Sequence, residues 1–194
     1  MDRSRPDSTA GPVALLLRDY QPTGEAEAAE VARLAEVARA EADPWSRAAP
    51  LHFTGSAVIV HPASGQVLLR WHQRQQAWLQ VGGHADPGES DPLAIALREA
   101  VEETGLTDLA PWPSAELRHA VIVSVPAGRG EPAHEHADLR IVLATRSPQD
   151  ARAESQDAPL RWLSAADAVR ATAEDNLKET LGRVQRLLAA AHAS

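Results

Sequence analysis

The stretch Leu97–Gly105, "LREAVEETG", places three glutamates, Glu99, Glu102 and Glu103, within five residues. In an α-helix, residues three and four apart share a face, so these carboxylates form one patch. Each like-charge neighbour at this spacing destabilises an exposed helix by about 0.2–0.5 kcal/mol, part of which Arg98 can relieve through Glu102. The stretch therefore predicts a helix with an acidic patch. Either water solvates this patch, or a bound cation neutralises it.

The residues around this stretch define the helix. Asp91 and Pro92 are typical of an N-cap and a first helical residue, and Gly105 is typical of the position after the last turn. The 3.6-residue period predicts one apolar side, with the three acids roughly opposite to it. The residues expected on the apolar side are Leu93, Leu97, Ala100, Val101 and Thr104.

The glycine-rich segment 82–90, "GGHADPGES", lies directly before this helix and bears on the two interpretations of the acids. A solvated acidic face is the common fate of such charge runs. A hard dication such as Mg²⁺, however, takes several oxygen ligands, which helical carboxylates and free loop carbonyls can supply together. The combination of loop and helix favours the cation.

The segment Gly83–Leu106, "GHADPGESDPLAIALREAVEETGL", resembles the signature box of the Nudix hydrolases, a MutT-like superfamily. The pattern is a glycine, five residues, a glutamate, seven residues, and Arg-Glu-apolar-any-Glu-Glu-any-Gly-apolar. Here eight residues separate Glu89 from Arg98, and we expect the additional one in the loop at Ser90–Asp91, before the helix. "HFTGSAVIV", "WLQVGGH", "HEHADLR" and "LRWL" also resemble a bacterial Nudix subgroup of undefined substrate. The resemblance implies an α/β Nudix fold, an α-β-α sandwich around a mixed β-sheet.

The rest of the chain fits a sheet covered by helices on both faces. "SAVIVH" and "QVLLRW" predict a hairpin that turns near Ala63–Gly65, and "AWLQV" predicts a short strand before the glycine-rich loop. We expect buried strands at "LRHAVIVSV", "LRIVLAT" and "PLRWL". Ser164 is expected to open a helical region that breaks near Asp175 and continues toward the end of the chain. The apolar face of its last part is formed by Leu177, Leu181, Val184 and Leu188.

The N-terminal part is predicted to be a separate helical extension, residues 1–45, ahead of a Nudix domain at 46–194. Met1–Gly11 is polar and is expected to be frayed. Residues 25–42 predict a helix with Thr23 as N-cap and Asp43–Pro44 as a stop, either packed on the main domain or solvated.

The resemblance also implies a reaction, the hydrolysis of a diphosphate bond in a nucleoside diphosphate linked to another moiety. Glu99, Glu102, Glu103 and the Gly82 carbonyl become the expected ligands of Mg²⁺ or Mn²⁺, and Arg98 would hold the carboxylates in place. The cations would neutralise the diphosphate, polarise a phosphoryl oxygen and help to generate the attacking hydroxide. The general base is open: Glu99 is one candidate, and Glu154 or Asp157 on a later polar loop are the others.

Two further segments carry candidate substrate residues. "HEHADLR" places four side chains on one face of a strand, because side chains alternate; they could bind zinc through the two histidines, face the substrate or serve the structure. "RWHQRQQAW" brings basic residues and two tryptophans ahead of the loop, and Trp78 could stack on a base or fill the core. The candidate substrate residues are Arg70, Arg74, His84, His134, His136, Asp138 and Arg140.

Composition excludes some classes. The 194 residues carry a formal net charge of −8 and no cysteine, which argues against duplex nucleic acid as a partner and removes disulfides, thiolate metal sites and a cysteine nucleophile. The apolar run "VALLL" is too short for a membrane span, and a cytoplasmic protein is expected.

The sequence motifs by which the ADP-ribose, dinucleoside polyphosphate and NADH hydrolases are distinguished within this superfamily are absent at the expected places. A noncatalytic nucleotide-binding Nudix sensor and a structural protein with an incidental acidic helix are the alternatives, and a homodimer is compatible because many relatives are dimers.

Overall fold

A mixed β-sheet built around one long strand, β1 (Leu51–His61), organises the chain. The computed structural model describes residues 11–128 and 130–193, so the prediction for Met1–Gly11 lies outside them except for Gly11. Strand β1 pairs antiparallel with β2 (Gln66–His72) and β4 (Val81–His84), and parallel with β7 (His134–Ala144). The predicted hairpin is confirmed, with Ile59 opposite Leu68.

The remaining strands extend this sheet on both sides. Strand β6 pairs antiparallel with β7, β8 and β3 pair with β2, and β5 pairs with β7. The predicted strand 77–81 is interrupted at Gln80, so the glycine pair 82–83 lies in a strand and not in a loop. The bounds are β3 Ala77–Leu79, β5 Ala110–Pro111, β6 His119–Val125 and β8 Leu160–Ser164, with a 3₁₀ turn at Pro148–Asp150.

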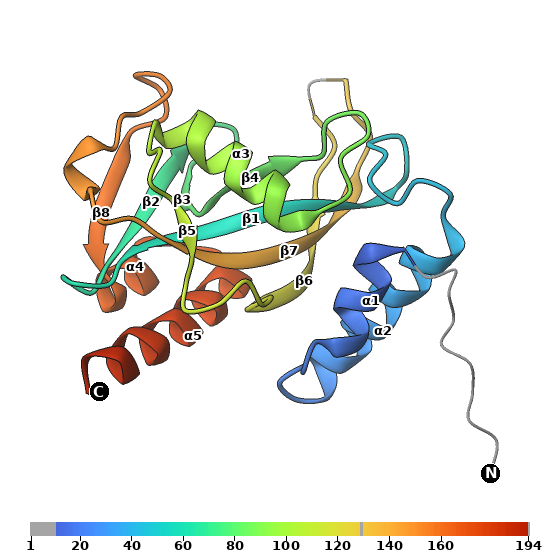
Figure 1. The fold of residues 1–194 in the computed structure, drawn as a ribbon. Coiled ribbons are helices and arrows are strands. Elements are labelled where there is room, and N and C mark those ends of the chain that lie inside the picture. Colours follow the sequence, from blue (N-terminus) through green and yellow to red (C-terminus); the bar gives the residue numbers. More distant parts are fainter. Residues whose placement is uncertain (1–10, 129, 194) are drawn as a thin grey trace, which may run out of the picture.

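Helices cover both faces of the sheet, as Figure 1 shows: α3 (Pro92–Thr104) lies on one face, and α4 (Ala165–Ala171) and α5 (Asp175–His192) lie on the other. Two hydrophobic clusters follow from this arrangement. One packs α3 on the side of β1 that carries Phe53 and Ile59, and the other packs α4 and α5 on the side that carries Val58 and Val60. The predicted α/β fold is confirmed, as is the buried apolar face of α5.

Helix α3 begins and ends where the sequence predicted. The Asp91 carboxylate accepts a hydrogen bond from the backbone N–H of Leu93, and Gly105 adopts the left-handed conformation at φ 66° that ends the helix. The prediction that Val101 lies on the apolar side is wrong, because its side chain is exposed. Ile95 and Ala96 are buried instead, on the same packed face as Ala100 and Thr104.

Two helices precede the sheet where one was predicted: α1 (Pro12–Asp19) and α2 (Glu25–Ala40). The apolar run "VALLL" forms α1, whose Val13 and Leu17 join the same hydrophobic cluster as Leu34 of α2. The prediction of Thr23 as N-cap is wrong, because Gly24 takes that position and no side chain caps the helix. The division into an extension and a Nudix domain stays a prediction. In the described part of the chain, no helix is both long and apolar enough to cross a membrane.

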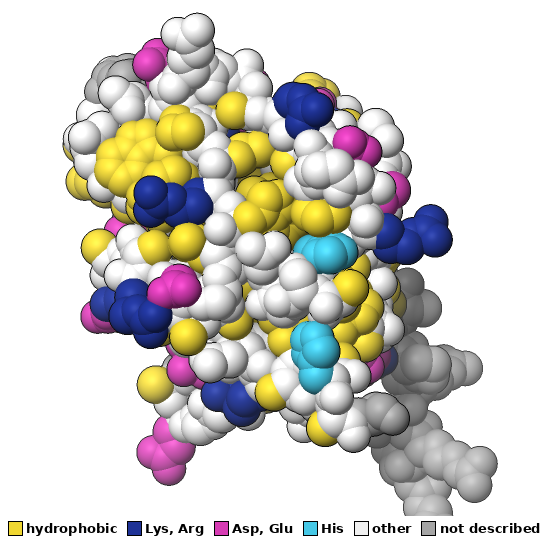
Figure 2. All heavy atoms as spheres, turned by 90° about the vertical axis from the view of Figure 1, so that its left-hand side faces the viewer, with side chains coloured by type: hydrophobic (Ala, Val, Ile, Leu, Met, Phe, Trp, Pro, Cys, Tyr) yellow, Lys and Arg dark blue, Asp and Glu magenta, His cyan; other side chains and the backbone are white. Residues whose placement is uncertain are grey.

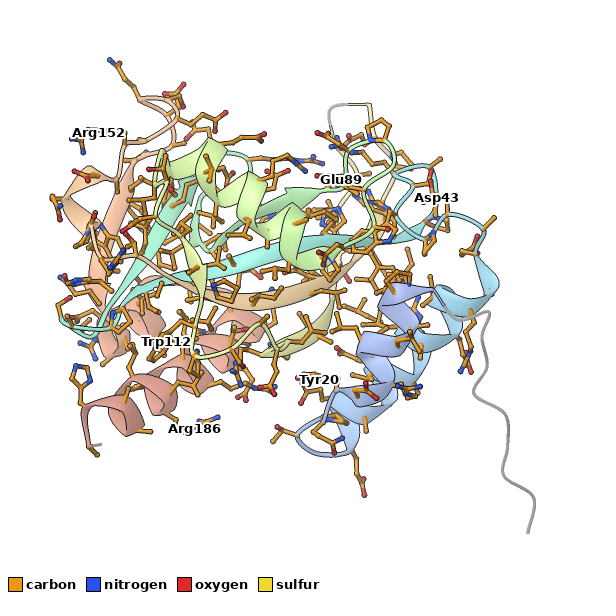
Figure 3. The ribbon with its side chains drawn as sticks, in the orientation of Figure 1. Tyr20, Asp43, Glu89, Trp112, Arg152 and Arg186 are labelled. Carbon is orange, nitrogen blue, oxygen red and sulfur yellow. The ribbon has the colours of Figure 1, made fainter. Side chains whose placement is uncertain are left out.

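A buried ion pair ties α2 to α5. Two nitrogens of Arg183 donate to the two carboxylate oxygens of Glu27 at 2.9 and 2.8 Å, and the Tyr20 hydroxyl also donates to Glu27. Figure 3 shows Tyr20 between the α1–α2 pair and the side of the molecule that carries α5. Burial alone raises the pKa of Glu27, but the hydrogen bonds from Arg183, Tyr20 and a backbone N–H outweigh it and lower the pKa to about 2.

We expect Glu27→Gln to lower the free energy of unfolding by about 3 kcal/mol at pH 7, because it leaves the buried Arg183 without its main counter-charge. The folded pKa of about 2 lies below the ordinary value of 4.5, so the Glu27 contribution is complete above about pH 5 and declines as the pH falls toward 2. Urea denaturation at pH 7, 4 and 3 measures the loss in the free energy of unfolding and its dependence on pH. The difference between wild type and variant should shrink at low pH, whereas exposed Asp19→Asn should change little; an equal difference at every pH would contradict the assignment.

The surface seen from the β8 side carries no continuous charged patch. Figure 2 shows this side of the molecule, with basic and acidic side chains scattered among hydrophobic ones. That the chain does not bind duplex nucleic acid stays a prediction from its net charge of −8.

Candidate active site

The three glutamates of α3 differ in exposure. The side chains of Glu99 and Glu103 are 16% and 14% exposed, whereas Glu102 is 56% exposed. The prediction that all three lie opposite the packed side is therefore wrong in part: two of them turn toward β4 and only Glu102 faces outward. Both inward carboxylates lie against the glycine pair of β4.

The pair Gly82–Gly83 makes this close approach feasible. The Gly82 N–H donates to Glu103 Oε2 at 3.1 Å. A Cβ on Gly83 would lie 2.5 Å from the Glu99 carboxylate, and one on Gly82, at φ 147°, would lie 2.6 Å from the Ser56 backbone. Gly82 is thus required by its backbone conformation and by the neighbouring backbone, and Gly83 leaves room for the Glu99 carboxylate in its observed place; the sequence signal for both was the doubled glycine itself.

Two arginines hold the acids. Arg98 Nη1 donates to Glu99 at 2.9 Å and to Glu102 at 3.2 Å, and its other nitrogens bond Glu89 and the His84 carbonyl. The segment between Glu89 and Arg98 is one residue longer than in the Nudix signature pattern, but the two side chains still form hydrogen bonds. Figure 3 shows Glu89 in the loop that leads to α3. Arg98 thus fixes the carboxylates, as predicted for its position.

The second arginine, Arg70 on β2, lies at the other side of Glu103. Its guanidinium is 3.2 Å from Glu103 and 2.8 Å from Glu154, so one of the two later-loop candidates for the general base reaches the site. Asp157 is exposed on the same loop. Burial raises the pKa of Glu103 to about 7, Arg70 and the Gly82 N–H oppose the increase, and the Glu99 and Glu154 carboxylates add to it.

Burial also raises the pKa of Glu99, with Arg98 opposing and Glu102 adding to the shift. Burial thus raises the pKa of both neighbouring carboxylates despite the nearby arginines. Such a cluster of hard oxygen donors fits Mg²⁺ or Mn²⁺. Glu99, Glu102 and Glu103 could hold the cation together with a backbone carbonyl such as that of Gly82.

We expect Gly83→Ala to lower turnover about 100-fold with little change in stability. The new Cβ occupies the place of the Glu99 carboxylate, a flexible group that can move at small energetic cost, and a displacement of about 1 Å at a catalytic group costs about 10²-fold. Steady-state kinetics and thermal unfolding measure the two effects. Gly182→Ala in α5, where a Cβ meets ordinary van der Waals distances, is the control; undiminished turnover by Gly83→Ala would contradict the role of Glu99.

On the opposite face of β1 lies a buried polar network centred on Asp138 of β7. Its carboxylate accepts hydrogen bonds from Ser56 at 2.6 Å, from Thr54 at 3.1 Å and from Arg140 at 2.7 Å. Arg140 continues to Asn176 and Thr180 of α5. Asp138 and Arg140 are 3% and 2% exposed, so most of their hydrogen-bonding capacity serves the fold.

A cavity of about 220 Å³ opens above this network. Its lining joins the glycine pair of β4 to the polar face of β7 and the start of α5. Four of the predicted substrate residues, His84, His136, Asp138 and Arg140, therefore line one cavity, which shares the pair Gly82–Gly83 with the acid site but is lined by none of the α3 glutamates.

Four histidines gather at one end of this face. His52, His84 and His136 come from β1, β4 and β7, and their nearest ring nitrogens lie within 4.8 Å of one another; His134 is next to His136. His52 was not among the predicted site residues, because the pairing of β1 with β4 and β7 cannot be read from spacing along the chain. Burial lowers the pKa of His52, that of His84 to about 3 and that of His136 to about 4.

The other predicted residues lie at the rim. Arg74 is paired with Glu131 at 3.0 Å and lines a neighbouring cavity of about 900 Å³, together with His134. Trp71 and Trp78 pack edge to face at 5.5 Å, and Arg161 lies over the Trp78 ring, which packs against the α4–α5 cluster. Arg74 and Trp78 are thus apart from the acids.

Comparison with known proteins identifies a family model and several solved structures that this chain resembles. The family model of the NUDIX domain matches residues 51–184. A binary complex of the C. elegans Ap4A hydrolase aligns with a TM-score of 0.57 and 20% identity over 71% of this chain and 98% of that one. The E. coli dihydroneopterin triphosphate pyrophosphohydrolase gives 0.52 and 18%, over 70% and 94%. The Nudix hydrolase RenU from M. smegmatis gives 0.52 and 20%, over 72% and 86%. These structures show the fold alone, and no curated protein matches the sequence.

Proposed function

The chain belongs to the NUDIX domain family, and from this premise we propose that it is a pyrophosphohydrolase that cleaves a diphosphate bond by attack of water at phosphorus. Its substrate is proposed to be a small nucleoside diphosphate linked to another moiety. The observation that carries this proposal is the pair of part-buried carboxylates, Glu99 and Glu103, packed against Gly82–Gly83 and flanked by arginines on both sides. A purely solvated acidic face would not bury them.

Glu99, Glu102, Glu103 and the Gly82 carbonyl would hold Mg²⁺ or Mn²⁺. When bound, the cation neutralises the diphosphate and polarises the phosphorus toward attack. Binding requires that Arg98 and Arg70 share the carboxylates or release them. Glu89 and Glu154 are in contact with the two guanidiniums and can keep them in place during that exchange.

The remaining roles follow from position. Arg70 lies beside both Glu103 and Glu154, where its charge can hold a phosphoryl oxygen. Glu154 is 54% exposed and Glu99 only 16%. Once Arg70 holds a phosphoryl oxygen, Glu154 can turn from its ion pair with Arg70 and accept a proton from water, whereas Glu99 stays bound to Arg98. We therefore favour Glu154 over Glu99 and Asp157 as the general base.

The cavity on the polar face of β1 is proposed to hold the rest of the substrate. It is lined by the same pair, Gly82–Gly83, that packs against the acids, and its donors and acceptors include Gln80 and Asn176, which suit a base or sugar. Cytoplasmic location, homodimer formation and membership of the bacterial subgroup remain predictions from the sequence.

Phosphate release from a panel of compounds tests the proposal. The panel should hold nucleoside diphosphates and triphosphates, nucleotide sugars, dinucleoside polyphosphates and a pterin triphosphate, each with Mg²⁺, with Mn²⁺ and with chelator. We expect turnover of at least one member that depends on the cation. Nucleotide binding by calorimetry without any turnover would support the sensor alternative, and neither binding nor turnover across the panel would contradict the proposal.

A further inference from the structure

The histidine side chains gather on the polar face of β1, opposite the face that carries the α3 acids, and none of them takes part in the proposed cleavage at phosphorus. His84 and His136 also line the cavity proposed for the rest of the substrate. The members of this histidine cluster belong to three adjacent strands, and the register sets their proximity: His52 of β1 is directly opposite His136 of β7, and His84 of β4 is opposite Thr54, two residues along β1 from His52. All three side chains point to the same face, because they differ by even steps of register.

Two contacts between ring nitrogens show how tightly these side chains converge. His52 Nε2 lies 3.1 Å from His84 Nε2, and His134 Nε2 lies 3.2 Å from His136 Nε2. Four nitrogens bound tetrahedrally to one Zn²⁺ at about 2.0–2.1 Å lie about 3.3 Å apart. These two separations match the edge of such a tetrahedron, and the ligand nitrogens of His52, His84 and His136 lie within 4.8 Å of one another, so a bound ion would draw the rings slightly closer together.

Backbone carbonyls fix the tautomers of two rings. His52 Nδ1 lies 2.9 Å from the Ala49 carbonyl, and His134 Nδ1 lies 2.9 Å from the Pro132 carbonyl. A carbonyl only accepts, so each Nδ1 carries a proton, and in the neutral form of either ring the lone pair lies on Nε2, which faces the cluster. This is the arrangement by which an outer carbonyl orients a metal-bound histidine.

The donor set decides the class of ion. Imidazole nitrogens without a carboxylate suit Zn²⁺ and neighbouring transition ions, and not Mg²⁺, which prefers oxygen. The positive charges nearby are partly compensated, since Arg74 is paired with Glu131 and Arg47 is exposed. The burial that keeps these imidazoles neutral also favours the form that binds metal.

From this geometry we propose that His52, His84 and His136 form a transition-metal site, filled by Zn²⁺, with His134 close enough to supply a fourth nitrogen. The sequence pointed only to the His134–His136 pair; the structure moves the centre to ligands from three strands. The bound ion would join β4, β1 and β7 at the mouth of the cavity of about 900 Å³. The site is separate from the acids of α3, so the proposal does not depend on the proposed function.

Equilibrium dialysis with Zn²⁺ at pH 7.5, with millimolar Mg²⁺ present, tests the proposal on the full chain. We expect one Zn²⁺ per chain, at least 100-fold weaker binding in His84→Gln and in His136→Gln, and unchanged binding in Glu103→Gln. His72→Gln is the matched control, because His72 lines the same cavity outside the cluster. Substoichiometric binding, or wild-type binding by both cluster variants, would overturn the proposal.

A measurement on the wild-type chain covers the case in which a cluster variant does not fold. Long-range ¹H–¹⁵N spectra of the imidazoles should show the Nε2 signals of His52, His84 and His136 shift in slow exchange when one equivalent of Zn²⁺ is added, while those of His61 and His192 stay unchanged. Equal shifts of all histidines, or no shift in the three, would mean that the cluster is held by hydrogen bonds alone.

Discussion

Glu103→Gln is expected to reduce cation-dependent turnover by about 10³-fold or more, equivalent to about 4 kcal/mol of transition-state stabilisation. The amide keeps the shape of the side chain and can still accept the hydrogen bond from the Gly82 N–H, but it loses the negative charge that holds the cation. Kinetics against cation concentration, with the most active compound of the panel, measure the effect. Glu102→Gln should lose turnover in the same way.

The fold should survive these substitutions. Burial raises the pKa of Glu103 to about 7, so its ionised form is unfavourable in the folded chain and a neutral amide removes that penalty. We expect the thermal midpoint of Glu103→Gln to equal or exceed that of wild type, which is the pattern of a residue kept for function. Exposed Glu116→Gln is the control for a lost carboxylate. Full turnover in both Glu102→Gln and Glu103→Gln would exclude these residues as cation ligands.

Asp138→Ala should lower the free energy of unfolding by about 4 kcal/mol, because it leaves the buried Arg140 guanidinium without a counter-charge. The hydroxyls of Thr54 and Ser56 lose their acceptor in the same change. Urea unfolding monitored by tryptophan fluorescence measures the loss. Asp175→Asn, at an exposed pair with Lys178, should have little effect.

Substituting Arg140 together with Asp138 distinguishes a structural role of Asp138 from a role in substrate binding. In Asp138→Leu combined with Arg140→Met, the buried charge and its counter-charge are removed together, so the double variant should be clearly more stable than the sum of the two single losses predicts. Wild-type stability in Asp138→Ala, with reduced turnover alone, would assign Asp138 to the substrate.

The sequence predicted those parts of the fold that depend on local rules. The hairpin turn, the Asp91 cap, the Gly105 terminus and the apolar face of α5 follow from turn chemistry and periodicity. Helix α1 was missed because a run of eight residues behind Pro12 shows too little periodicity to distinguish a helix from a strand. Val101 was misplaced because the tilt of α3 on the sheet decides which residues are covered.

Only those residues of the candidate site that lie in one continuous segment could be predicted from the sequence. The box gave Arg98, Glu99, Glu102 and Glu103 directly. The inward turn of Glu99 and Glu103, the contact of Arg70 with Glu103 and the convergence of His52 on His84 depend on which strands become neighbours, which is a long-range property. No spacing along the chain carries that information.

Strand β1 has one further consequence. Its residues alternate between the core under α3 and the opposite face, where Thr54 and Ser56 line the polar cavity and Val58 and Val60 pack against α4 and α5. A shift by a single residue would move Phe53 to that opposite face and misplace the neighbours on both sides at once. Evolution toward a new substrate can therefore exchange side chains at every second position, but it cannot insert or delete within the strand. Natural variants with changed specificity should therefore conserve the chain length between residues 51 and 61.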